Sequence, residues 1–186
     1  TNYSQRKKNL EKRKNILKKL DDDRSKKELK ILERLYTLGS VNFDSVIIID
    51  FGTNLKSVLS SLVYTDVDDK AVLITTVNQW FDESIFRGNL VKNLYFPSVD
   101  IKQFKKYNEN YFETFGIKPN EITILAYDAL GLIYYVWNKN NRIKNINDFF
   151  IKEKFKGKIG IFEFKKMKVS QQLKIYKIEN NKFKEY

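Results

Sequence analysis

The sequence predicts an α/β fold, in which a doubly wound parallel sheet is followed by C-terminal antiparallel strands. Over residues 45–97, short β-branched runs alternate with helical patterns about every 25 residues, which is typical of parallel strands joined by right-handed crossovers. Near the C-terminus, residues 157–164 and 172–178 alternate apolar and polar side chains, as antiparallel strands do.

The first 38 residues predict a pair of basic helices. Leucines and isoleucines recur at helical spacing over residues 5–20, with Lys and Arg between them. Asp21–Asp23 offer N-cap oxygens to a second helix over residues 22–38, which is expected to end at Gly39. The pair is interpreted as part of the fold, because its apolar stripes must cover something. A basic binding arm is the alternative.

Three short strands are predicted over residues 45–50, 71–75 and 93–97. The first two are continuous apolar runs, which indicates strands that are buried on both faces. A helix over residues 55–63 and a short helix over residues 82–88 connect them. The pattern therefore predicts a β-α-β-α-β unit.

Three more helices are predicted over residues 100–115, 120–138 and 146–155. The middle one is apolar nearly all round, so we expect it to be deeply buried. Asn180-Asn181 is expected to turn the chain into a last strand over residues 182–186.

Composition excludes several kinds of chemistry. The 186 residues include no His and no Cys, which excludes His- or Cys-based catalysis, imidazole and thiolate metal sites, and disulfides. The carboxylates, hydroxyls and lysines that remain form no recognisable catalytic constellation. We therefore predict a non-catalytic protein that uses no cofactor and no metal.

The net charge of +12 is unevenly distributed. Residues 1–34 and 151–186 each carry +7, whereas the 116 residues between them carry −2. The surplus is mostly Lys and accompanies abundant Asn, Ile, Phe and Tyr, which is the amino-acid bias of an AT-rich genome. An anionic membrane or glycan surface is a second explanation. Nucleic acid is disfavoured, because Arg is scarce and no nucleic-acid-binding motif is present.

Several strings, in their order along the chain, resemble the second lobe of type I periplasmic binding proteins, the leucine-binding-protein superfamily. They are ERLYTLGSVNFDSVIIIDFG, LSSLVYTDVDDKAVLITTVNQW, ITILAYDALGLIY, FKGKIGIFEF and KIENNKF, together with residues 107–116. Within that superfamily the sequence is most similar to the penicillin-binding protein activator lipoproteins of the alphaproteobacterial type. The likeness extends from about Leu10 to Tyr186. In one departure, residues 165–169 read KKMKV where the pattern has a hairpin glycine.

The resemblance implies that residues 1–186 form a single α/β lobe, with the helical pair of residues 1–38 as part of it and C-terminal strands over residues 157–186. A first lobe would lie upstream, together with any lipoprotein signal that anchors the protein to a membrane. The protein would then be periplasmic. The apolar helix over residues 120–138 would pack against that first lobe and expose an apolar face in its absence.

Ligands of open parallel α/β sheets bind beyond the carboxyl ends of the strands, which predicts a site from the residues that follow each strand. These are Asp50, Phe51, Gly52 and Thr53 after the first strand, Thr75, Thr76, Asn78, Gln79 and Trp80 after the second, and Phe96, Pro97 and Ser98 after the third. An Asp would hold an ammonium group, Thr and Asn would donate hydrogen bonds, and an aromatic ring would pack on a ligand side chain.

These residues also have plain structural interpretations. Residues 50–54 would form a turn that caps the next helix, and Trp80 would anchor a loop or the core. Asp128 lies inside the apolar helix and needs a partner, because burying an unpaired carboxylate is costly. Tyr127 or a helix N-terminus is expected to supply that partner. A structural role and a hinge or cleft role are both open for Asp128.

The resemblance implies two functions. One is an activator that docks onto a membrane-bound peptidoglycan synthase and shifts its active population. The other is the receptor of an ABC transporter, which closes around an amino acid or a similar small molecule and passes it to the permease. The absence of a Gly- and Ser-rich cradle favours the activator, and the positions of Asp50 and Thr75-Thr76 favour the receptor. The ligand-sensing lobe of a transcription regulator is a third interpretation. It is disfavoured, because no helix-turn-helix pattern precedes the domain within these 186 residues.

Overall fold

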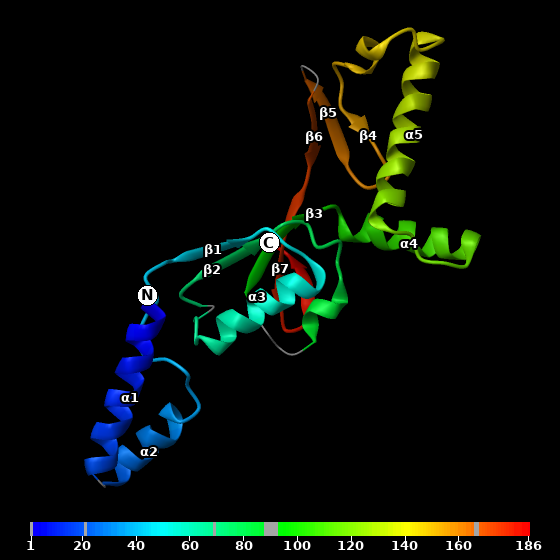
Figure 1. Ribbon diagram of the computed structural model, residues 1–186. Coiled ribbons are helices and arrows are strands. Elements are labelled where there is room, and N and C mark those ends of the chain that lie inside the picture. The colour runs from blue at the N-terminus through cyan, green and yellow to red at the C-terminus, as the bar shows by residue number, and fades with distance from the viewer. Residues whose placement is uncertain (1, 21, 69, 88–92, 166–167) are drawn as a thin grey trace. The chain divides into compact units, whose positions relative to one another are not determined.

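The structure is a computed structural model that describes residues 2–20, 22–68, 70–87, 93–165 and 168–186 (Figure 1). The chain divides into two compact units. One comprises residues 1–96 and 177–184, and the other comprises residues 97–176 and 185–186. The single α/β lobe that the sequence predicts over residues 1–186 stays a prediction.

The first unit begins with a helical hairpin, formed by α1 (Asn2–Leu20) and α2 (Asp23–Leu32). Asp22 is the N-cap of α2, as predicted, because its Oδ1 accepts a hydrogen bond from the Ser25 N–H at 2.9 Å. Asp21, which was also a predicted cap, lies outside the described residues. Leucines from both helices form the buried core of the hairpin, namely Leu10, Leu17 and Leu32.

The second helix is shorter than predicted, since it ends at Leu32 and not near residue 38. The backbone N–H groups of Tyr36 and Thr37 donate to Asp66 Oδ2 at 2.8 and 2.7 Å. These long-range bonds take the place of helical ones. Gly39, with φ of 105°, therefore lies in a loop and is not the cap of this helix.

Five strands form the larger sheet in the order β1-β2-β3-β7-β8. Their bounds are Ser45–Ile48, Leu73–Thr76, Leu94–Ser98, Lys174–Glu179 and Lys182–Glu185. The pairs β1–β2 and β2–β3 are parallel, with Ile47 opposite Thr75 and Thr75 opposite Tyr95. The predicted parallel unit is thereby confirmed. Asn180 and Asn181 have φ of 50° and 56°, as a type I′ turn between β7 and β8 requires.

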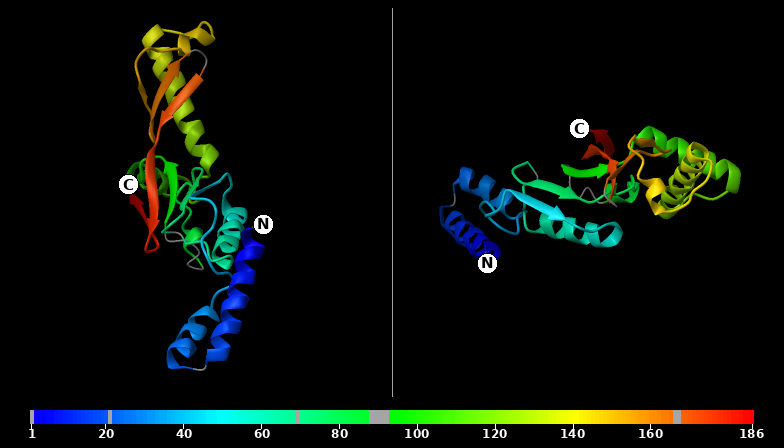
Figure 2. Two further views of the ribbon diagram at one scale, coloured as in Figure 1. Left: turned by 90° about the vertical axis from the view of Figure 1, so that its left-hand side faces the viewer. Right: turned by 90° about the horizontal axis from the view of Figure 1, so that it is seen from above.

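One helix covers the β1–β2 part of the sheet. Helix α3 (Gly52–Tyr64) lies along one face, where it buries Leu55 and Leu59 (Figure 2). The short connection after β2 is a 3-10 helix, η1 (Glu83–Phe86). The prediction of strands buried on both faces is wrong, because side chains on the other face are exposed. They are Ile47 and Leu73, with Ile49 just beyond β1.

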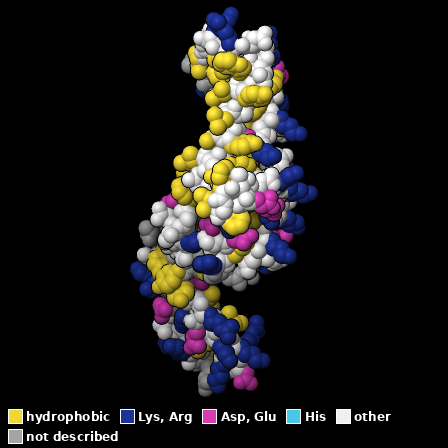
Figure 3. All heavy atoms as spheres, turned by 90° about the vertical axis from the view of Figure 1, so that its right-hand side faces the viewer, with side chains coloured by type: hydrophobic (Ala, Val, Ile, Leu, Met, Phe, Trp, Pro, Cys, Tyr) yellow, Lys and Arg dark blue, Asp and Glu magenta, His cyan; other side chains and the backbone are white. Residues whose placement is uncertain are grey.

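The second unit contains two long helices, α4 (Ile101–Phe115) and α5 (Glu121–Asn140). Deep burial of α5 was predicted, but its only buried residues are Ile124, Asp128 and Val136. Much of its apolar surface is exposed, as the region of α5 in Figure 3 shows.

A three-stranded antiparallel sheet completes the second unit in the order β4-β5-β6. Its strands are Phe155–Lys156, Ile161–Lys165 and Lys168–Gln172. The predicted helix over residues 146–155 is reduced to a 3-10 turn, η2 (Ile146–Phe149). The predicted strand over residues 172–178 is divided at Leu173, since β6 and β7 belong to different sheets. Within the KKMKV departure, residues 166–167 lie outside the described residues.

Candidate functional site

The carboxyl ends of β1 and β2 are joined through one backbone oxygen. The Asp50 carbonyl accepts hydrogen bonds from Thr76 Oγ1 at 3.1 Å and from Gln79 Nε2 at 3.0 Å. Thr76 Oγ1 also lies 2.8 Å from the Ile48 carbonyl oxygen, and Gln79 Nε2 lies 3.0 Å from that of Val77. Thr76 and Gln79 are each only 5% exposed. Thr76, a predicted ligand donor, and Gln79, a predicted site residue, therefore use their side chains inside the protein to hold the two loops together.

The loop after β1 leaves other groups open to solvent. Asp50 Oδ1 accepts a hydrogen bond from the Phe51 N–H at 2.9 Å, and the Asp50 side chain is half-buried. Phe51 and Thr53 are exposed, and Gly52 takes a left-handed φ of 59° where α3 begins. No side chain caps α3. A carboxylate thus lies beside the N–H groups of a first helical turn, which attract anions.

The residues after β2 do not share one surface. Successive side chains of a strand point to opposite faces, so Thr75 and Thr76 cannot act as a pair toward one ligand. Asn78 Oδ1 accepts a hydrogen bond from the Trp80 N–H at 2.9 Å, which shapes the loop. Trp80 is half-buried, so its role as an anchor or as a ligand platform stays a prediction. Ser98, at the end of β3 in the other unit, is fully buried.

Two consecutive aromatic residues in this loop have strained backbones. Trp80 and Phe81 have φ of 48° and 58°, a region that bulky residues seldom occupy. Phe81 is buried against Phe183 and Phe96, with ring centroids 5.4 and 6.0 Å away. This packing holds the strained conformation in place. The strain was not visible in the sequence, because it depends on partners that are distant in the chain.

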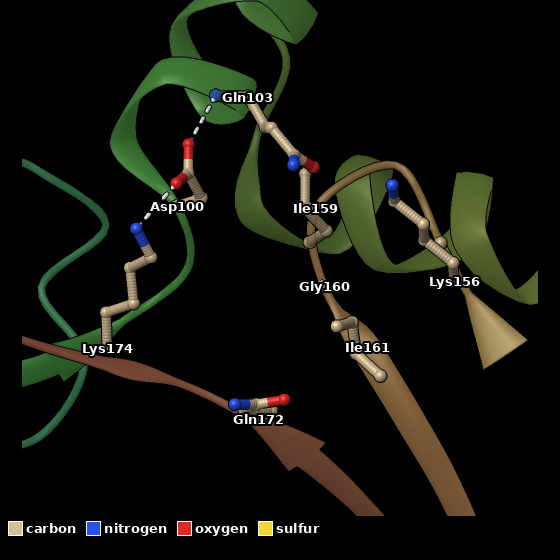
Figure 4. A pocket seen from close by; sticks show the side chains of 9 residues that line it. Asp100, Gln103, Lys156, Ile159, Gly160, Ile161, Gln172 and Lys174 are labelled. Carbon is tan, nitrogen blue, oxygen red and sulfur yellow. Dashed lines mark hydrogen bonds and ion pairs between the residues drawn. The ribbon is translucent and has the colours of Figure 1, made fainter. Parts of the chain in front are cut away.

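The second unit contains a cavity that the sequence did not predict, with a volume of about 270 Å³ (Figure 4). Lys174 Nζ forms ion pairs with Asp100 Oδ2 at 2.9 Å and with Glu185 Oε1 at 2.8 Å. Asp100 also accepts hydrogen bonds from the N–H groups at the start of α4. The lining residues are Asp100, Gln103, Lys156, Gly157, Ile159, Gly160, Ile161, Gln172 and Lys174.

These ion pairs shift the pKa values of the groups that form them. The hydrogen bond with Lys174, and then that with the Gln103 N–H, lowers the pKa of the Asp100 carboxyl below its ordinary 3.8. Glu185 and Asp100 together raise the pKa of the Lys174 ammonium. Asp100 before α4 is a recognisable N-cap in the sequence, but its pairing with Lys174 depends on the fold.

Asp128 is buried in α5 and is bound by backbone groups. Its carboxylate accepts hydrogen bonds from the N–H groups of Lys158 and Ile159, at 3.2 Å in the case of Ile159. The prediction of Tyr127 or a helix N-terminus as its partner is wrong. Gly157 lies so close to this carboxylate that a Cβ there would approach it to less than 3.0 Å. Asp128 thereby connects α5 to the loop before β5.

No family model and no curated protein matches the sequence. A putative branched-chain amino acid ABC transporter from Rhodospirillum rubrum aligns with a TM-score of 0.63 and 11% identity, over 77% of this chain and 44% of that chain. The leucine binding protein LivK from Thermotoga maritima aligns with a TM-score of 0.56 and 15% identity, over 77% and 43%. This chain has the fold of type I periplasmic binding proteins. The fold that the resemblance implied is confirmed.

This chain is also similar in structure to the C-domain of LpoA (YraM) from Haemophilus influenzae, which is described as a regulator of PBP1A. It aligns with a TM-score of 0.50 and 10% identity, over 84% of this chain and 48% of that domain. The chain spans less than half the length of these three proteins. Since these neighbours are binding proteins and a regulator, they support a binding-protein-like module and leave its role open.

The described residues contain no helix that is long and apolar enough to cross a membrane. Among these same residues there is also no group of three or more acidic side chains that could hold a metal ion.

Proposed function

We propose that this chain belongs to a non-catalytic periplasmic protein that regulates a membrane-bound peptidoglycan synthase through protein–protein contact. The observation that supports this best is the shared use of the Asp50 carbonyl by Thr76 and Gln79. These side chains would be ligand donors in a solute receptor, but here they are buried and already bonded. A small polar ligand would find few donors at this edge of the sheet.

The surface next to these residues suits a protein partner. Ile49 is 81% exposed and Phe51 is 69% exposed. Buried aromatic and aliphatic side chains supply much of the energy at protein interfaces. The likeness to the LpoA C-domain, described as a regulator of PBP1A, supports a synthase of the PBP1A type as the partner. Tighter binding to the active state of the synthase would raise the population of that state.

The test is to measure binding of this chain to a detergent-solubilised synthase of the PBP1A type by surface plasmon resonance. Ile49→Ser combined with Phe51→Ser should weaken binding by about tenfold or more, as loss of buried anchors does. Asp50→Ala should change binding less than threefold, on the order of the change for a residue at the rim of an interface. The control is Val169→Ser, which replaces an aliphatic residue in the other unit that is 62% exposed.

Equal binding by the double variant and the wild type would contradict the proposed contact surface. If a correctly folded Asp50→Ala variant lost synthase binding, Asp50 would belong to the contact surface. The proposed separation of this surface from the candidate solute site would then be wrong.

The second candidate is a solute receptor of an ABC transporter. It is favoured by the Asp50 carboxylate beside the uncapped first turn of α3, since a zwitterionic amino acid carries the complementary charges. Thermal unfolding with amino acids, short peptides and peptidoglycan fragments separates the two candidates. A ligand at 100 times its Kd stabilises by about 2.7 kcal/mol, which raises Tm by roughly 5–11 °C for a chain of this size. A rise that Asp50→Ala abolishes supports the receptor, and no rise with any compound supports the regulator.

A further inference from the structure

The α1–α2 hairpin has exposed aliphatic side chains that its own core does not use. Ile16 is 51% exposed and Leu20 is 57% exposed on α1, and Ile31 is 63% exposed on α2. The core of the hairpin consists of other leucines. Three large aliphatic side chains on two short basic helices therefore face away from that core.

These three residues lie on one side of the hairpin. Arg13 and Glu28 are bonded across the two helices at 2.7 Å, so they mark the same side. Ile16 and Leu20 follow Arg13 by three and seven residues, and Ile31 follows Glu28 by three residues. Side chains at these spacings share one stripe of an α-helix. The aliphatic stripes of both helices therefore flank the Arg13–Glu28 pair.

Basic side chains surround these stripes. Lys12 and Lys19 border Ile16 on α1, at positions four residues before and three after it. Arg24 and Lys27 precede Ile31 on α2 at helical spacing. All four are exposed, and residues 1–34 carry a net charge of +7. Figure 3 shows the Lys and Arg side chains that gather over the hairpin from one side of the molecule.

We propose that this face of the α1–α2 hairpin binds the surface of an anionic phospholipid bilayer. The aliphatic side chains match the acyl-chain boundary of a bilayer, and the basic rim around them matches its anionic headgroups. Lys side chains keep their charge in water while their stems lie on apolar surface. A hydrophilic polyanion such as nucleic acid would use the rim alone. The helices lie on the bilayer and do not cross it. This inference is independent of the proposed synthase contact.

The first test is co-sedimentation of the whole chain with vesicles of phosphatidylcholine, with and without about 30 mol% of phosphatidylglycerol, whose negative surface potential attracts basic segments. Binding should require phosphatidylglycerol and weaken as salt rises. Lys12→Ala with Lys19→Ala should lower the partition coefficient about 25-fold, since each cation near the surface contributes about fivefold. The matched control is Lys182→Ala, an exposed Lys on β8, which should have little effect.

The second test separates a bilayer from other polyanions. Ile16→Ser with Leu20→Ser should lower vesicle binding about tenfold or more through lost apolar contact, whereas Ile117→Ser with Ile146→Ser should not. Both control residues are exposed isoleucines in the other unit. Circular dichroism and Tm of each variant confirm that it is folded. Unchanged vesicle binding by the Ile16 and Leu20 variant would overturn the proposal.

The absence of Cys allows a third, direct measurement. An environment-sensitive fluorophore attached to a Leu20→Cys variant should shift its emission to shorter wavelength with anionic vesicles. The same label in place of Ser57, an exposed residue of α3, should not shift. Equal shifts at the two positions, or tighter binding to single-stranded DNA than to vesicles through the same lysines, would overturn the proposal.

Discussion

The side-chain amide of Gln79 donates a hydrogen bond to the backbone carbonyl of Asp50 across 3.0 Å and thereby connects the ends of two neighbouring parallel strands. Thr76 Oγ1 donates to the same oxygen. The sequence marks all three residues as candidates for a ligand site, because each follows a strand. In the structure, the Thr76 and Gln79 side chains are hydrogen-bonded to the Asp50 backbone.

This relationship predicts that Gln79→Ala destabilises the fold. The variant leaves buried carbonyl groups without one donor, which costs about 1–3 kcal/mol of unfolding free energy. Urea unfolding followed by circular dichroism measures the change. Gln172→Ala serves as the control, because this exposed glutamine should contribute less than about 0.5 kcal/mol. A similar small loss in both variants would show that the hydrogen bond is not important for stability.

Asp66 should be essential for the loop after α2. Its Oδ2 accepts hydrogen bonds from the Tyr36 and Thr37 N–H groups and lies 3.1 Å from Thr37 Oγ1. Asp66→Ala removes the acceptor for these donors and should lower the unfolding free energy by about 2–3 kcal/mol. Asp68→Ala, at an exposed Asp nearby, should have a much smaller effect. If the two variants unfold at the same urea concentration, the assigned role of Asp66 is wrong.

Two glycines of the second unit should respond oppositely to substitution by Ala. Gly157→Ala would place a Cβ against the Asp128 carboxylate and should cost about 1–3 kcal/mol, as overpacking does. Gly131 lies inside α5, and its nearest neighbour, Phe155 Cζ, would be at an ordinary 3.5 Å from the new Cβ. Gly131→Ala should therefore stabilise by about 0.5–1 kcal/mol through helix propensity. Differential scanning calorimetry measures both, and a stabilising Gly157→Ala would be the contrary result.

Stability should fall in acid partly because of Asp100. Its pKa in the folded protein lies below the ordinary 3.8, chiefly because of the hydrogen bond with Lys174. The unfolded state then binds the proton more readily, so this stabilisation is complete above the unfolded pKa and is lost as pH falls through the folded pKa. Urea midpoints measured from pH 6 to pH 2 should decrease more for the wild type than for Asp100→Asn. Parallel curves would contradict the assignment.

Much of the fold was predictable from local patterns. The parallel arrangement of β1, β2 and β3 follows from short apolar runs at crossover spacing, and the β7–β8 turn follows from Asn180-Asn181, because these residues accept positive φ at low cost. The caps Asp22 and Asp100 were also accessible, since each bonds to N–H groups only two or three residues away.

Contacts between distant residues decided the rest. The second helix ends at Leu32, and beyond it the N–H groups of Tyr36 and Thr37 bind Asp66, far along the chain, in place of helical carbonyls. Apolar residues such as Ile47 and Ile49 indicate that a face can be buried, but the elements packed around them determine whether it is. The candidate site divides in the same way. The sequence by itself determined that polar residues lie at the carboxyl ends of the strands. Only the tertiary structure decided that Thr76 and Gln79 are used internally, because a hydrogen-bonding group is assigned to its partner only when the fold brings the two together.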